Sequence, residues 1–211
     1  SSVSRGMLSR NSVRARIERY SRDDIEDMFE LNVRSIDFHG LALEKLGLLT
    51  GTNEGLELGR KVNRIEGAVL YSRLIGVEHE IEKFKVLNPS YDTGFTDVPD
   101  WAKDTINYLH YMNLISGVSN DKFGSSLEMT ENQFVTLILR ALGYSETNGD
   151  FDWETADVTA YELGFYDDDY IPYNIIKTGG FTRGMMSYIA YNSLFVENKI
   201  TGVRLLDNII E

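Results

Sequence analysis

The apolar positions of this chain follow a helical pattern that occurs three times. A residue able to cap a helix stands at Asn63, Thr130 and Thr182, and an apolar stripe follows each at offsets +4, +7, +8, +11 and +12. The stripes are Gly67, Leu70, Tyr71, Leu74, Ile75; Phe134, Leu137, Ile138, Ala141, Leu142; and Met186, Ile189, Ala190, Ser193, Leu194. Because one such unit cannot bury its own apolar face, the copies are expected to pack together.

A helix stop precedes each cap at nearly constant spacing. Gly47, Asn113 and Gly164 are residue types that adopt the left-handed conformation after a helix at low cost, and they precede the caps by 16, 17 and 18 residues. Each unit is therefore predicted to be a helix, a glycine-containing loop and a second helix. The expected fold class is mainly α.

Outside the repeats, the pattern predicts two further helical stretches. Apolar spacing favours a helix over residues 12–31, interrupted at Asp23 and Asp24, and a closing helix over residues 203–210. Polar stretches around residues 88–90 and 145–149 are expected to join the units.

Composition narrows the function classes. The net charge is −12, and residues 1–22 carry +5, which leaves an acidic body of −17. Such a surface repels nucleic acid and anionic lipid, and with no run of about 20 apolar residues neither nucleic-acid binding nor membrane insertion is expected. The chain has no cysteine, so disulfides, thiolate metal sites and thiol catalysis are excluded.

Two charged segments leave alternatives open. The arginine-rich start (Arg5, Arg10, Arg14, Arg16, Arg19, Arg22) suits a basic helix that grips the acidic body, a solvated leader, or a second contact for an anionic polymer. Residues 141–176 hold nine acids and no lysine or arginine, which fits a solvated face, with a calcium site or a glycosidase-like acid pair at 150–169 as alternatives. His39, His79 and His110 lack metal-ligand spacing, and no metal site or cofactor is expected.

The caps themselves could bind anions. A helix N-terminus presents unpaired N–H groups and a partial positive charge. In Asn63-Arg64-Ile65-Glu66 the Asn and Glu form a capping box, which leaves Arg64 to point outward with a planar fork suited to a carboxylate, and Thr182-Arg183 repeats the cap and the arginine.

The second unit carries a fuller motif. It contains Phe95-Thr96-Asp97-Val98-Pro99-Asp100-Trp101-Ala102, then Leu114-Ile115-Ser116-Gly117, Phe123, Met129-Thr130 and Leu139-Arg140-Ala141-Leu142-Gly143. With the flanking copies, this pattern resembles the S-layer homology (SLH) family over residues 37–194, most closely in the second unit.

The resemblance implies a bundle of three SLH-like repeats with pseudo-three-fold symmetry and grooves between units. The implied divisions are a basic helical extension (1–36) and repeats at 37–80, 92–145 and 150–211. Family members bind secondary cell-wall polymer, often bearing ketal-linked pyruvate. The ligand-binding residues implied here are Arg64, Arg183, Asn63, Thr182 and Glu66 at the caps, Asp97 and Trp101 in the second unit, and Gly51 and Gly117 where backbone must approach closely. Trp101 and Trp153 also suit a place in the core or on a groove wall.

The copies depart from the family pattern. The second has Glu131 where the arginine is expected, and the third ends its cap signature in Met185. Fewer than three working grooves are therefore expected. The sequence predicts a non-catalytic module that holds an exported protein on a Gram-positive-type cell wall or S-layer by binding an anionic, pyruvylated polysaccharide. The alternative is a degenerate SLH scaffold for protein–protein contact, self-association or S-layer assembly.

Overall fold

The computed structural model describes residues 19–31, 37–167 and 180–210, and over these ranges the chain is mainly helical, as predicted. The β-structure in this part of the chain consists of isolated bridges. The helices are α2 (Arg22–Phe29), α3 (Phe38–Lys45), α4 (Arg64–Leu74), α5 (Glu78–Leu87), α6 (Lys103–Tyr111), α7 (Glu131–Ala141), α8 (Ala156–Glu162), α10 (Arg183–Ser193) and α11 (Leu205–Ile209), with 3₁₀ turns η2 (Asp100–Ala102) and η3 (Trp153–Thr155) before α6 and α8. None of them is long and apolar enough to cross a membrane.

The three predicted caps and the three predicted stops are confirmed. The side chains of Asn63, Thr130 and Thr182 each accept a hydrogen bond from the backbone N–H three residues on, at the starts of α4, α7 and α10. Gly47, Asn113 and Gly164 have φ of 75°, 56° and 88° after α3, α6 and α8. Local chemistry therefore fixes where each unit's helices begin and end.

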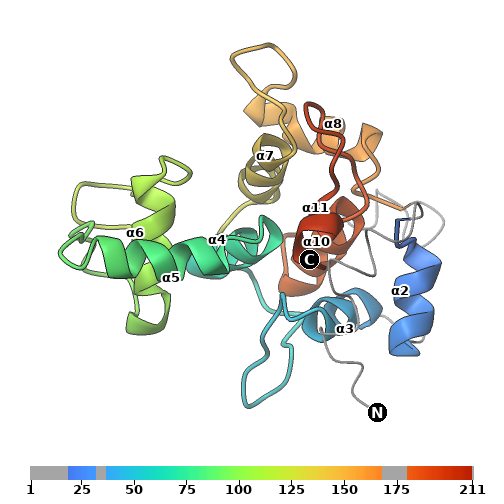
Figure 1. Ribbon diagram of the computed structural model, residues 1–211, viewed down its shortest axis with the longest axis horizontal. Coiled ribbons are helices and arrows are strands. Elements are labelled where there is room, and N and C mark those ends of the chain that lie inside the picture. The colour runs from blue at the N-terminus through green and yellow to red at the C-terminus, as the bar shows by residue number, and fades with distance from the viewer. Residues whose placement is uncertain (1–18, 32–36, 168–179, 211) are drawn as a thin grey trace.

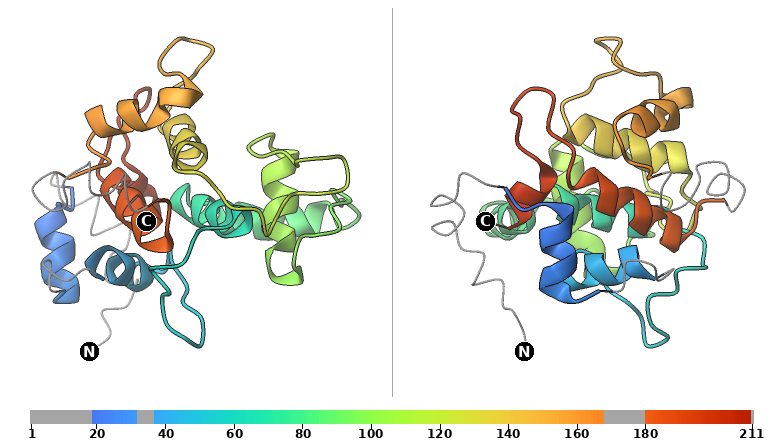
Figure 2. Two further views of the ribbon diagram at one scale, coloured as in Figure 1. Left: turned by 180° about the vertical axis from the view of Figure 1, so that it is seen from behind. Right: turned by 90° about the vertical axis from the view of Figure 1, so that its right-hand side faces the viewer.

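The capped helices meet near the middle of the molecule (Figures 1 and 2). Helix α7 lies against both α4 and α10. Ahead of their N-termini the chain pairs as isolated bridges, Lys61 with Thr182 and Asn63 with Glu128. The first helix of each unit packs on the capped helix of another unit: α3 on α10, α6 on α4 and α8 on α7.

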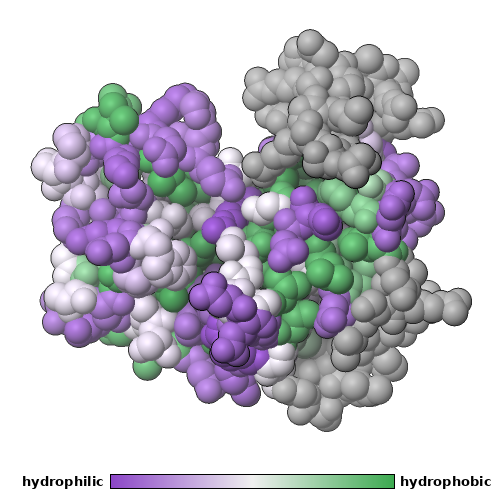
Figure 3. Space-filling view, turned by 90° about the horizontal axis from the view of Figure 1, so that it is seen from below, coloured by the Kyte–Doolittle hydropathy of each residue, from purple (hydrophilic) through white to green (hydrophobic). Residues whose placement is uncertain are grey.

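Three clusters of buried side chains form the interior. The largest joins α3, α7, α8, α10 and α11, and two smaller ones lie between α4 and α6 and between α5 and α6. Helix α4 contributes Leu70, Ile65 and Tyr71 to the three clusters in turn, so it is buried on most sides. Seen from below, hydrophobic residues gather on the half of the surface away from α5 and α6 (Figure 3).

The structure corrects one helix prediction and adds a helix. Asp23 and Asp24 do not interrupt a helix but occupy the first turn of α2, where Ser21 and Asp24 form a capping box. Acidic residues stabilise a helix start, which is why two of them mark a beginning here. Helix α5 was not predicted, and the proposed boundary at residue 80 falls inside it. The closing helix is confirmed as α11.

The predicted N-terminal extension lies partly outside the described residues, which leave out 1–18 and 32–36. Arg5, Arg10, Arg14 and Arg16 fall in the first of these ranges. The other two arginines of the basic segment contact the body. Arg19 pairs with Glu197 at 2.6 Å, and Arg22 donates to the Asn192 amide oxygen at 2.6 Å.

Candidate binding grooves

Two cavities open between units, and each is lined by two arginines and one tryptophan. The first groove has a volume of about 350 Å³ and is lined by the 48–52 loop, Glu66 and Arg73 of α4, Arg183 of α10, and Trp101. The second groove has a volume of about 410 Å³ and is lined by the 113–116 loop, Gln133 and Arg140 of α7, Arg64 of α4, and Trp153. Both volumes lie in the range of small-ligand sites.

In the first groove, Arg183 is buried, with only 4% of its surface exposed. Its guanidinium donates to the carbonyls of Leu56 (2.9 Å) and Thr50 (3.2 Å) and pairs with the Glu66 carboxylate at 3.3 Å. Burial lowers the pKa of Arg183, and the Glu66 carboxylate opposes that shift. The expectation that this arginine points outward is therefore wrong, because its guanidinium is buried in the groove wall, where it bonds to two carbonyls and a carboxylate.

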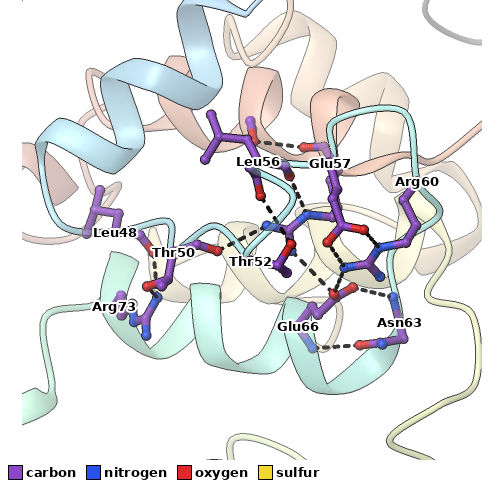
Figure 4. Close-up of polar contacts among 12 residues, drawn as sticks. Leu48, Thr50, Thr52, Leu56, Glu57, Arg60, Asn63, Glu66 and Arg73 are labelled. Atoms are coloured by element: carbon purple, nitrogen blue, oxygen red, sulfur yellow. Dashed lines mark hydrogen bonds and ion pairs between the residues drawn. The ribbon is translucent and has the colours of Figure 1, made fainter.

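Glu66, which lies beside Asn63 and Arg60 in Figure 4, connects the cap of α4 to that cation. One carboxylate oxygen accepts from the Asn63 N–H at 3.0 Å to complete the capping box. The other accepts from Arg60 at 2.6 Å and from Arg183 at 3.3 Å. Asn63 and Glu66 thus act first as cap residues, and Glu66 alone of the two also lines the groove.

Arg73 is a residue of the first groove that was not predicted from the sequence. Its guanidinium donates to the Leu48 carbonyl and the Thr50 hydroxyl, both at 3.1 Å, as Figure 4 shows. Burial lowers its pKa, and Glu78 opposes that shift. Arg73 stands ten residues after the Asn63 cap and Arg140 ten residues after Thr130. This equal distance from the caps is the sequence feature that could have identified both arginines as groove residues.

In the second groove, Arg64 is partly exposed and bonds to neutral groups. It donates to the carbonyls of Phe123 (3.2 Å) and Ser116 (3.1 Å), and its guanidinium lies over the Phe123 ring at 4.8 Å. Burial lowers its pKa, and the charge of Asp97 opposes the shift. The fork is therefore held in place by the loop that it contacts.

Asp97 supports the second groove without lining it. Its carboxylate accepts from the backbone N–H groups of Phe123, Gly124 and Ser125 at 2.8, 2.8 and 3.0 Å. Burial raises the pKa of Asp97, but these three bonds outweigh burial and lower it overall. Asp97 fixes the loop whose carbonyl holds Arg64.

The two predicted glycines meet backbone closely, but in different settings. A side chain at Gly51, which lines the first groove, would meet the Gly55 carbonyl oxygen at 2.9 Å. One at Gly117 would meet the carbonyl oxygens of Lys122 and Ser119 at 2.6 and 2.7 Å, so this glycine lets the 117–122 turn close. Thr182 serves as the cap of α10.

Each groove has an exposed indole at its edge. Trp101, in η2, is 65% exposed, and Trp153, in η3, is 59% exposed. They are groove-wall residues and leave the core to smaller side chains. An exposed indole beside polar donors can stack on the apolar face of a sugar ring.

The second and third units also meet, where α7 packs against α10. At the position that corresponds to the two grooves, the residue after the cap has the opposite charge. Glu131, the first residue of α7, accepts a hydrogen bond from the Tyr166 hydroxyl. Ten residues after the Thr182 cap stands Asn192, which donates to the Phe165 carbonyl at 3.0 Å and accepts from Arg22 of α2. This location carries a carboxylate where the two grooves carry a cap arginine.

Two residues of the acidic stretch, Asp150 and Asp152, have structural roles. Asp150 pairs with Lys199 and accepts from the Ser145 N–H, and Asp152 caps η3. Asp168 and Asp169 lie outside the described residues. Within the described ranges, no three His, Asp or Glu side chains are grouped to hold a metal ion.

Comparison with curated proteins finds relatives of the cell surface. The chain is 33% identical to a "Cell surface protein" of Thermoanaerobacter kivui over 122 residues, which is 56% of this chain and 15% of that protein. It is 30% identical to a "Surface layer protein" of Brevibacillus choshinensis over 105 residues, 48% of this chain and 9% of that protein.

A third relative is an "Amylopullulanase" of Thermoanaerobacterium thermosulfurigenes, 26% identical over 149 residues, 66% of this chain and 8% of that protein. No protein-family model matches the chain. The chain thus spans 15% or less of the length of these relatives. It resembles a short part of each of these three proteins, two of which are named for the cell surface or surface layer.

Proposed function

We propose that the chain is a non-catalytic module that holds a larger protein on the bacterial cell surface by binding an anionic wall polysaccharide in its two grooves. In this proposal the units at 37–80, 92–145 and 150–211 are SLH-like repeats gathered around their capped helices. The ligand is a secondary cell-wall polymer of a Gram-positive-type envelope, and its acidic group is a ketal-linked pyruvate.

One observation carries the proposal: each groove brings two guanidinium groups and one exposed indole into the same cavity. Guanidinium forks bind carboxylates through charge-assisted hydrogen bonds, and an indole face suits a sugar ring. The acidic body discourages nonspecific binding of polyanions, so focused arginines are the feature able to select one. The names of two relatives agree with a place at the cell surface.

A pull-down with purified wall sacculi tests this function. The chain should sediment with intact sacculi and remain in solution after the secondary polymer has been removed chemically. Replacing both Trp101 and Trp153 by alanine should abolish sedimentation while leaving the melting temperature within about 2 °C. Tyr111→Ala is the matched control, because Tyr111 is also an exposed aromatic residue (52%) but lines neither groove. Sedimentation that persists without the polymer would refute the proposal.

A second candidate function, a protein–protein or S-layer assembly module without glycan binding, is favoured by the Glu131 location. Glu131 stands there in place of the cap arginine, so this location lacks the guanidinium that would bind an acidic sugar. Self-association in analytical ultracentrifugation, together with failure to bind sacculi of either kind, would support this function in place of the first.

A further inference from the structure

The two grooves carry arginines at the same two positions of the repeat. One arginine follows a helix cap, Arg183 in the first groove and Arg64 in the second. The other stands ten residues after a cap, Arg73 in the first and Arg140 in the second. The two grooves therefore have the same two arginine positions, and they differ in which of the two arginines forms an ion pair with a carboxylate.

In the first groove the cap arginine is the neutralised one. Arg183 pairs with Glu66 at 3.3 Å. Arg60 shares that carboxylate at 2.6 Å and also meets Glu57 at 3.4 Å, so two carboxylates face two guanidinium groups. Arg73 donates to a carbonyl and a hydroxyl, and across the described ranges no carboxylate lies within ion-pair distance of it. The positive charge that remains for a ligand is at Arg73.

In the second groove the pairing is reversed. Arg140 forms a two-pronged pair with Glu146, at 2.5 and 3.1 Å. Arg64 bonds to the carbonyls of Phe123 and Ser116, and among the residues that the structure describes it has no ion-pair partner. The remaining positive charge is here at the cap.

The residue three places after each cap explains the difference at the cap arginine. This position holds Glu66 on α4, whose second oxygen meets Arg183, but Gln133 on α7. The Gln133 oxygen accepts from the Thr130 N–H at 3.0 Å, so this side chain offers the groove a neutral amide where Glu66 offers a carboxylate. One turn on, the buried Thr136 hydroxyl also lines this groove and has no hydrogen-bond partner among the described residues.

We infer that the two grooves hold the acidic group of their ligand at opposite ends, at Arg73 in the first and at Arg64 in the second. A carboxylate gains most where it meets a guanidinium that forms no ion pair, and it must compete where an internal pair exists. Glu78 and Asp97 act on Arg73 and Arg64 only from beyond ion-pair distance. The same polymer would therefore lie in the two grooves with its acidic substituent at different places. This inference rests on the proposed function.

The chain offers one reporter for each groove, because Trp101 and Trp153 are its two tryptophans. The ¹⁵N-labelled chain shows two indole N–H signals, which Trp101→Phe and Trp153→Phe assign. The probe is a methyl hexoside bearing a 4,6-linked pyruvate ketal, and its methyl ester is the neutral control. Titration gives a separate dissociation constant for each groove.

Arg73→Gln should weaken binding at Trp101 at least tenfold and leave Trp153 unaffected. Arg64→Gln should do the same at Trp153, whereas Arg140→Gln should weaken that groove less than threefold. Two further variants exchange the residue three places after the cap, Glu66→Gln on α4 and Gln133→Glu on α7. These exchange variants keep both capping boxes, since Glu and Gln both suit that position. Glu66→Gln should tighten the first groove several-fold, and Gln133→Glu should weaken the second by a similar factor.

Two kinds of failure are distinguishable. If the probe shifts neither indole signal of the unaltered chain, the proposed function fails and takes the inference with it. If the probe binds but Arg140→Gln costs as much as Arg64→Gln, or if the exchange variants have no effect, the function stands and the opposed arrangement is overturned.

Discussion

The guanidinium of Arg183, on α10, lies 3.3 Å from the carboxylate of Glu66, on α4. The two residues are 117 positions apart in the chain, and the side chain of Arg183 is 5% exposed against 14% for Glu66. The pair joins the cap of one helix to the start of another. Its removal should therefore affect folding as well as binding.

Arg183→Met is expected to lower the free energy of unfolding by about 3 kcal/mol, because it leaves the carbonyls of Leu56 and Thr50 without this donor and removes one of the two guanidinium groups that face the largely buried Glu66 carboxylate. Urea denaturation measures it. Arg60→Ala is the control, since Arg60 contacts the same carboxylate from a side chain that is 39% exposed and should cost less than about 1 kcal/mol. Equal losses in the two variants would argue against a structural role specific to Arg183.

Asp97→Asn should destabilise the chain by about 2 kcal/mol at neutral pH, because an amide cannot accept the three backbone bonds that the carboxylate accepts. The pKa of Asp97 is lowered in the folded state, so its contribution is present above the unfolded value of about 3.9 and is lost as pH falls through the folded value. The stability gap between the two chains should stay constant above pH ~5 and narrow below pH ~4. A gap that widens in acid would contradict this account.

His39 should make the chain acid-sensitive. It is buried against the rings of Phe38, Tyr188 and Tyr191, and burial, followed by the charge of Arg22, lowers its pKa to about 3. Because the folded pKa lies below the unfolded value of about 6.5, stability is full above that value and declines as pH falls toward 3, by up to about 1.4 kcal/mol per pH unit. His39→Phe should flatten the unfolding free energy between pH 6 and 4. An unchanged slope would show that other groups cause it.

Gly67→Ala should cost about 1–2 kcal/mol, because the added methyl group would lie 2.2 Å from the sulfur of Met129. Met129 is flexible and can partly yield. In a Met129→Ala background the clash is gone, so Gly67→Ala should become neutral or stabilise the helix. A double-mutant cycle by thermal unfolding measures this coupling, and an additive result would place the cost elsewhere.

Local chemistry was readable from the sequence, and long-range pairing was not. Caps and stops depend on residues within a few positions, which is why Asn63, Thr182 and Gly164 were placed correctly. The partner of Arg183 is a carboxylate on another unit, and a single sequence gives no signal for it. The role of Asp97 was also beyond reach, since the loop it holds lies 26–28 residues further along the chain.

Two omissions had different causes. Arg73 and Arg140 were not predicted as groove residues, because the capping motif lies at the helix starts and these arginines stand ten residues further on, although that equal distance from the caps is visible in the sequence. Helix α5 has two buried side chains, Ile81 and Phe84, in ten residues. Its apolar spacing is therefore too sparse to stand out from a polar connection.

The bond between Arg183 and the Thr50 carbonyl spans 133 residues, and it closes the first groove with material from both halves of the chain. Closing so long a loop costs entropy that only the finished contacts return, and folds rich in such contacts form slowly. When the chain is synthesised from its N-terminal side, the 48–52 loop of this groove is made early. Arg183, which lies 133 residues after Thr50, is made much later. The first groove, although it begins with the 48–52 loop, can therefore be completed only after α10 has been made.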